Sequence, residues 1–80
     1  MKRAEILAHL TTLAREKVGY RGEIEPHQRL VEDLELDSLG LLTLATEVED
    51  HFRICLDESD EASLVTVADL AALVERKLAT

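Results

Sequence analysis

Cysteine, proline, glycine and aromatic residues are all scarce in this 80-residue chain, which has one Cys, one Pro, three Gly, one Tyr, one Phe and no Trp. The single cysteine, Cys55, excludes an internal disulfide and a zinc site built on cysteine ligands. With so few aromatic side chains, the core must consist of Leu, Val, Ile and Ala, which suits helices packed on helices. No apolar run reaches the length of a membrane-spanning helix or of the apolar segment in a secretory signal. We therefore expect a soluble, cytoplasmic protein without membrane insertion.

Positive charge is also in short supply, because 17 Asp and Glu residues outnumber 9 Lys and Arg residues and leave a net charge of −8. A small protein with this much negative charge repels DNA, RNA and anionic lipid surfaces, so we expect no nucleic-acid partner. The same charge attracts proteins whose docking sites are lined by Arg or Lys. An acidic surface is also a common solubility device, so charge alone names no function.

Three segments have apolar residues at three- and four-residue steps, and each predicts an amphipathic helix. The first runs from Lys2 to Lys17, with Gly19 just beyond it. The second begins at Ser38 after the N-cap residue Asp37, and its apolar stripe is Leu41, Leu44, Ala45, Val48 and Phe52. The third runs from Val67 to Leu78 after a capping-box pair, and its stripe is Val67, Leu70, Ala71, Val74 and Leu78.

The segments between these helices complete the expected fold. Residues 18–37 lack periodicity and predict a long loop, pinned to the core by Ile24, Leu30, Leu34 and Leu36. Residues 57–62 are acidic and predict one or two helical turns. The expectation is an all-α, four-helix bundle with three main helices, one short helix and a long first loop. We expect residues 1–80 to form a single domain and a monomer.

The most informative stretch is residues 30–39, LVEDLELDSL, which ends in an Asp-Ser-Leu triplet opening an acidic helix. This stretch resembles the signature of the acyl carrier protein family, and the likeness extends over nearly the whole chain in the order and spacing of its helices. A serine in the first turn of a helix projects its hydroxyl beside unsatisfied amides and the positive end of the helix dipole. A phosphodiester on that hydroxyl would lie where anions are favoured. The simpler alternative is that Asp37 and Ser38 only cap a helix.

The resemblance implies that Ser38 carries 4'-phosphopantetheine, transferred from coenzyme A by a separate phosphopantetheinyl transferase. It implies that Asp37 caps the helix and helps the transferase hold the magnesium-bound donor. The terminal thiol of the arm would carry acyl groups as thioesters and present them to enzymes of fatty-acid, lipid or polyketide-type biosynthesis. Family members are carriers and not enzymes, so no catalytic residue is expected.

The resemblance also implies two surfaces around the Ser38 helix. The docking residues are expected to be Leu39, Thr43, Thr46, Glu47, Glu49 and Asp50. Their carboxylates would meet basic residues of acyl-loading ligases or synthases and of acyl-transferring enzymes, although a solvated helix face is the simpler alternative. The acyl pocket is expected between this helix and the last helix, near Leu42, Val48, Leu64 and Leu70.

Three residues depart from the pattern of housekeeping fatty-acid carriers. Glu35 replaces the customary glycine before the Asp-Ser pair, Gly40 replaces an acidic or polar residue, and Thr43 replaces a glutamate that partners read. These differences favour a dedicated pathway with its own ligase or synthase.

Two other function classes stay open, namely a peptidyl or aminoacyl carrier of the same fold and a helical interaction module without a prosthetic group. A peptidyl carrier usually has a Gly-Gly pair before its serine, where this chain has Leu36 and Asp37. None of the three histidines has a partner at metal-ligand spacing, and the acidic run 57–61 lacks the glycine and terminal glutamate of an EF-hand loop. We therefore expect no metal site. Cys55, after Phe52 and Ile54, is expected to be half-buried.

Overall fold

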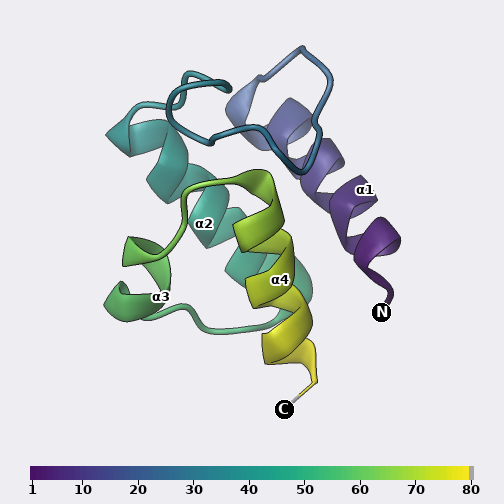
Figure 1. The fold of residues 1–80 in the computed structure, drawn as a ribbon. Coiled ribbons are helices and arrows are strands. Elements are labelled where there is room, and N and C mark those ends of the chain that lie inside the picture. The colour runs from purple at the N-terminus through teal and green to yellow at the C-terminus, as the bar shows by residue number, and fades with distance from the viewer. Residues whose placement is uncertain (80) are drawn as a thin grey trace.

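Four α-helices, joined by one long and two shorter loops, make up residues 1–79, the part of the chain that the computed structural model describes (Figure 1). The helices are α1 (Arg3–Leu13), α2 (Ser38–Phe52), α3 (Glu58–Ala62) and α4 (Val67–Leu78). No strand forms within these residues, although an isolated antiparallel bridge joins Arg29 and Thr66. The expected all-α fold with three main helices and one short helix is confirmed.

The starts of α2 and α4 follow from local capping chemistry. Asp37 is the N-cap of α2, and its carboxylate accepts a hydrogen bond from the Gly40 amide at 2.7 Å. At α4, the Thr66 hydroxyl accepts from the Asp69 amide at 3.1 Å, and the Asp69 carboxylate accepts from the Thr66 amide at 2.9 Å. Each cap satisfies amides that have no partner within the helix. Both starts therefore lie where the sequence predicts them.

The end of α1 is not regular α-helix. Residues Ala14–Val18 form a π-helical turn, which closes on Gly19 in the left-handed conformation with φ 81°. The Tyr20 amide then donates to the carbonyl of Ala14 at 3.0 Å. The expected helix from Lys2 to Lys17 is thus helical over nearly that range, but Val18 belongs to the helix and not to the loop.

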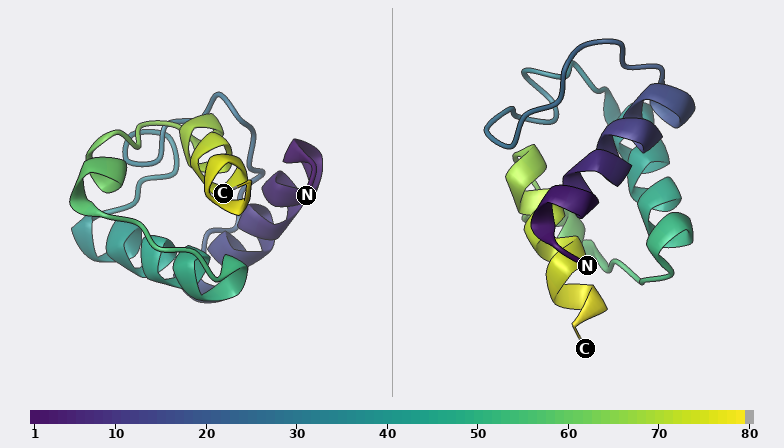
Figure 2. Two further views of the ribbon diagram at one scale, coloured as in Figure 1. Left: turned by 90° about the horizontal axis from the view of Figure 1, so that it is seen from below. Right: turned by 90° about the vertical axis from the view of Figure 1, so that its right-hand side faces the viewer.

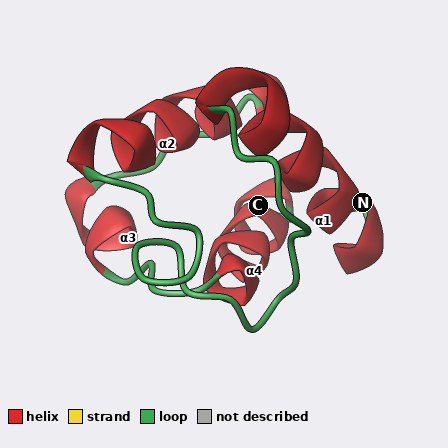
Figure 3. Ribbon diagram, turned by 90° about the horizontal axis from the view of Figure 1, so that it is seen from above, coloured by secondary structure: helices red, strands yellow, loops and turns green. Residues whose placement is uncertain are grey.

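The long loop between α1 and α2 runs along the start of α4. The Leu30 amide donates to the Val65 carbonyl at 2.8 Å, and the Val67 amide donates to the Gln28 carbonyl at 2.9 Å. Leu30, Leu34 and Leu36 are buried, and Ile24 packs against the core from its half-buried position. Figure 3 shows this loop arching across the open end of the bundle. The expectation that these four side chains anchor the loop is confirmed.

The core lies where α1, α2, α4 and the long loop meet. Packing of α1 against both α4 and α2 brings the three main helices together (Figure 2). The largest fully buried side chains are Ile6, Leu30, Val48 and Val74. Burying a side chain of this kind stabilises the fold by roughly 1.5–3 kcal/mol.

Burial differs from the predicted stripes at three residues. Leu78 is 38% exposed, because it lies in the last turn of α4, which extends past the beginning of α1 (Figure 2). Leu41 is only half-buried, since it borders a groove described below. Conversely, Leu73 is buried although it lies off the narrow stripe. The buried arc of α4 is therefore wider than the predicted stripe.

The short helix α3 is attached mainly by polar contacts. It contains no buried residue. The Asp60 carboxylate pairs with Lys77 at 3.0 Å and with Arg76 at 3.5 Å, which ties α3 to α4. On the other side, the Glu49 carboxylate accepts a hydrogen bond from the Leu56 amide at 3.0 Å, which holds the loop between α2 and α3.

None of the helices in residues 1–79 combines the length and the apolar character needed to cross a membrane.

Candidate functional site

Ser38 is the first residue of α2, and its side chain is exposed. Asp37 fixes the start of the helix by capping the Gly40 amide, and the carbonyl of Asp37 accepts from the Leu41 amide at 2.9 Å. Within the described residues, the amides of Ser38 and Leu39 donate to no protein acceptor. Two free donors and the positive end of the helix dipole thus surround the Ser38 hydroxyl, and this environment favours an anionic group there.

An apolar groove lies beside Ser38. Its volume is about 220 Å³, and its lining consists of Ser38, Leu41, Leu42, Ala45, Glu61 and Leu64. The groove therefore runs from the start of α2 along one side of that helix to α3 and the segment that follows α3. No histidine, lysine or arginine lines it. It offers apolar shelter next to the serine, and Glu61 is its one ionisable side chain.

A phosphodiester-linked arm fits these residues. The exposed hydroxyl can be esterified without moving the core, and the free amides of the first turn can donate to phosphate oxygens. The groove can shelter part of a chain that extends from Ser38. The donor set and the adjacent shelter together match a phosphopantetheine arm.

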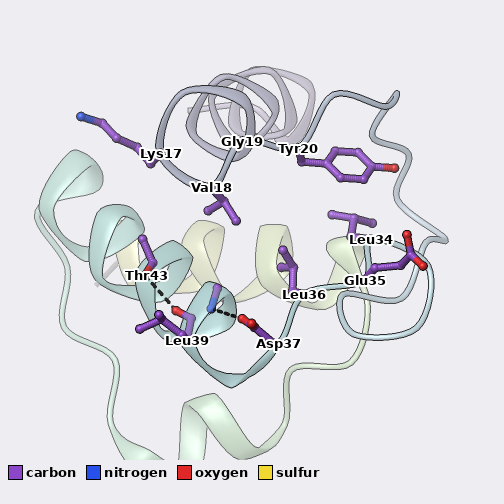
Figure 4. Close-up of a pocket in the computed structure, with 11 residues that line it drawn as sticks. Lys17, Val18, Gly19, Tyr20, Leu34, Glu35, Leu36, Asp37, Leu39 and Thr43 are labelled. Carbon is purple, nitrogen blue, oxygen red and sulfur yellow. Dashed lines mark hydrogen bonds between the residues drawn. The ribbon is translucent and has the colours of Figure 1, made fainter.

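A larger cavity, which sequence reasoning missed, lies on the other side of the α2 N-terminus. It has a volume of about 420 Å³ and is bounded by the π-helical turn with Tyr20, by residues 34–37 and by the first turns of α2. Figure 4 shows Val18, Leu36 and Leu39 among its lining side chains, with Lys17 directed away from its centre. Ser38 does not line this cavity. No periodicity marks it, because its walls come from three separate segments.

Gly40 lines this cavity, and its lack of a side chain allows the close contact with the capping carboxylate of Asp37. An added Cβ at Gly40 would lie 3.1 Å from the Asp37 carboxylate oxygen that accepts the Gly40 amide. The missing side chain thus leaves room for the carboxylate beside the helix start. Gly40 destabilises α2 by roughly 1 kcal/mol relative to Ala. The Asp37 cap offsets part of that cost.

The expected docking residues lie along α2 and differ in solvent exposure and in the hydrogen bonds that they make. Leu39 is 71% exposed, and Thr46 and Asp50 are also exposed. The hydroxyls of Thr43 and Thr46 donate to the carbonyls of Leu39 and Leu42, at 2.8 and 2.9 Å. Four of the expected residues, Thr46, Glu47, Glu49 and Asp50, border one shallow hollow. The docking role itself stays a prediction.

Glu49 has a structural task that its position in the sequence did not reveal. Its carboxylate is half-buried and holds the Leu56 amide, as described above. Replacing Glu49 would therefore disturb the loop between α2 and α3 as well as the surface charge. Asp50 is the acidic residue of this pair that is available to a partner.

The four residues expected around an acyl pocket divide into two pairs. Leu42 and Leu64 line the groove beside Ser38. Val48 and Leu70 are 0% and 2% exposed and belong to the core cluster. An acyl group could reach Val48 and Leu70 only if the core opened, so the deeper part of the pocket stays a prediction.

Two expectations about isolated side chains need revision. Cys55 is exposed and not half-buried, because the extended segment after α2 turns Ile54 and Leu56 inward and Cys55 outward. His9 and His51, which are remote in sequence, lie together with His51 Nε2 3.0 Å from His9 Nδ1. Residues 1–79 contain no cluster of three or more His, Cys, Asp or Glu side chains that could hold a metal ion.

Comparisons with known proteins agree with this geometry. A family model described as the phosphopantetheine attachment site matches residues 8–74. The meromycolate extension acyl carrier protein of Mycolicibacterium aurum is 33% identical over 73 residues, which cover 90% of this chain and 75% of that protein. The acyl carrier protein of Thermotoga maritima is 31% identical over 77 residues, which cover 95% of each chain. A crystal structure of an acyl carrier protein from Thermotoga maritima matches with a TM-score of 0.88 at 26% identity, over 99% of this chain and 93% of that one.

Proposed function

This chain belongs to the acyl carrier protein family, with a phosphopantetheine attachment domain, and we propose that Ser38 is the residue to which its 4'-phosphopantetheine is attached. The observation that carries this proposal is the position of Ser38. It is an exposed hydroxyl at the capped start of α2, between free first-turn amides and an apolar groove. Neither of the other two serines lines this groove. Ser59 is the second residue of the five-residue helix α3, and the Ser63 hydroxyl donates to the Asp60 carbonyl at 2.8 Å.

The chain acts as a carrier and depends on other proteins for chemistry. The groove beside Ser38 is lined by no histidine, and its one carboxylate, Glu61, comes from α3. A separate phosphopantetheinyl transferase would supply the catalytic base, the coenzyme A donor and its magnesium ion. Once attached, the arm supplies a terminal thiol on which acyl groups travel as thioesters. Tethering raises the effective concentration of the cargo at each docked enzyme.

The partners that load and use the cargo are proposed to dock on the outer side of α2. Leu39 offers an exposed apolar contact beside the arm, and Asp50 offers an exposed carboxylate further along. A basic surface on a ligase, synthase or acyl-transferring enzyme would complement this face and the net charge of −8. Leu39 would then fix the position of the partner, while the carboxylates would speed the encounter.

Incubation with coenzyme A, magnesium and a broad-specificity transferase tests the attachment site. The wild-type chain should gain the mass of one phosphopantetheine group, and Ser38→Ala should gain none. Stability should change by roughly half a kcal/mol or less, because the exposed hydroxyl makes no contact that the fold needs. The matched controls Ser59→Ala and Ser63→Ala should be modified at the wild-type rate. A peptide map that places the group on either of those serines would refute the proposal.

A further inference from the structure

His9 and His51 form a pair that the carrier function does not use. His9 lies on α1 and His51 lies in the last turn of α2, and the nitrogen atoms His51 Nε2 and His9 Nδ1 are 3.0 Å apart. His51 is exposed and His9 is half-buried, so solvent reaches the pair. The site is remote from Ser38, since 13 residues of helix at 1.5 Å each separate the ends of α2 by about 20 Å.

Phe52 positions both imidazole rings. Its ring meets His51 edge-on with centroids 4.9 Å apart and meets His9 edge-on at 5.8 Å. Phe52 itself is buried in the core cluster. The two imidazoles are not stacked, because their planes are inclined by 48°. The buried Phe52 ring thus contacts two imidazoles from different helices, and one nitrogen of each imidazole is directed toward the other.

The nitrogen separation suits two adjacent ligands of one metal ion. Imidazole nitrogens bind such ions at about 2.1 Å, so two ligands at a right angle are separated by about 3.0 Å and two tetrahedral ligands by about 3.4 Å. The observed 3.0 Å is the length of the hydrogen bond between the two rings, and it also equals the separation of adjacent ligands of a square-planar or octahedral ion. That geometry with nitrogen ligands is preferred by Cu²⁺ and Ni²⁺. A turn of the exposed His51 ring is needed, so that the two lone pairs converge on one point.

We propose that His9 and His51 form a two-imidazole binding site for a divalent transition-metal ion of the Ni²⁺ or Cu²⁺ class, with water molecules completing the coordination. Binding replaces the hydrogen bond between the two rings and cross-links α1 to α2 at the end away from Ser38. Because both ligands come from the folded structure, the ion binds the folded state in preference to the unfolded chain.

Nickel titration followed by calorimetry and by thermal unfolding tests this site at pH 7.5 in a Cys55→Ser background, which removes the exposed thiol as a competing ligand. One Ni²⁺ should bind per monomer, and a hundredfold excess over Kd should raise Tm by on the order of 10 °C. His9→Gln and His51→Gln should each weaken binding by on the order of 100-fold, because each loses the advantage of a tethered second ligand. His27→Gln is the matched control and should bind like the parent.

Three outcomes would overturn the proposal. Equal affinity of the parent and the His9→Gln/His51→Gln double variant would show that nickel binds elsewhere. Loss of binding in His27→Gln alone would assign the site to that histidine. Binding that occurs only with dimer formation, measured by sedimentation, would show that the ion bridges two molecules. Loading of the arm on Ser38 should be unaffected by all three histidine substitutions.

Discussion

Glu35 adopts a backbone conformation that suits glycine. Its φ is 57°, in the left-handed region, and it is one of two non-glycine residues with positive φ among the described residues. It lies in the tight connection between the buried side chains of Leu34 and Leu36, just before the Asp37 cap. Its own side chain is exposed and takes part in no hydrogen bond or ion pair with any residue from 1 to 79. Glu35→Gly therefore removes strain without removing a contact.

The expected gain is modest but measurable. A non-glycine residue in the left-handed region costs roughly 1–2 kcal/mol. Glycine also lowers the free energy of unfolding by about 0.4–1 kcal/mol, because it gives the unfolded chain more conformational freedom. The net stabilisation should be about 0.5–1 kcal/mol. For a domain of this size, that corresponds to an increase in Tm of roughly 2–8 °C.

Charge must be separated from conformation, because Glu35→Gly also removes one negative charge from a chain of net charge −8. Glu35→Gln is the matched control, since it removes the same charge and keeps the strained conformation. Thermal and urea unfolding should rank the free energy of unfolding as Gly above Gln, and the gap should persist at high salt, where charge effects are screened. If Gln equals or exceeds Gly, the strain argument is wrong.

Three further predictions address the core, the docking face and acid stability. Val48→Asp should unfold the chain, because an unpaired buried charge costs several kcal/mol, whereas the total free energy of unfolding is roughly 5–10 kcal/mol. Circular dichroism of this variant, compared with Val48→Ala, tests the prediction. A cooperative melt near the parental Tm would contradict the core assignment. Asp50→Lys should slow acyl loading by native partners at low salt and less at high salt, whereas Glu16→Lys on the π-helical turn is the charge-matched control and should not. The pKa of Asp69 lies below its ordinary value because the amides of Thr66 and Val65 donate to its carboxylate; its stabilising effect is thus complete above about pH 4 and lost as pH falls through the lowered pKa. Urea midpoints of Asp69→Asn should therefore fall less steeply than those of the parent below pH 4, and parallel curves would refute the assignment.

The helix boundaries were predictable because their causes are local. Asp37 and Thr66 cap the helices that follow them, and Gly19 ends the first helix in the left-handed conformation. Each signal lies within a few residues of the boundary it sets, so a pattern in sequence is enough to find it. The same reasoning places Ser38 at the start of α2.

What the sequence could not predict depends on packing between remote segments. His9 and His51 are separated by 42 residues, and no pattern relates them until α1 packs on α2. The sequence predicts Glu49 to be a surface carboxylate, because nothing near it in the sequence indicates that the Leu56 amide will donate to it. Leu78 fits the α4 stripe but is 38% exposed, because periodicity indicates which face is apolar and not how far the neighbouring helices extend.

The polar attachment of α3 has a consequence for hydrogen exchange. Because α3 contains no buried residue, separating it from the bundle exposes almost no core surface and requires mainly the loss of the Asp60 pairs with Lys77 and Arg76. Its amides should therefore exchange through a low-energy local opening, at rates that mild denaturant barely changes. The amides of α4 should instead exchange through global unfolding. Since Glu61 on α3 borders the groove beside Ser38, the same local event should open and close that side of the groove.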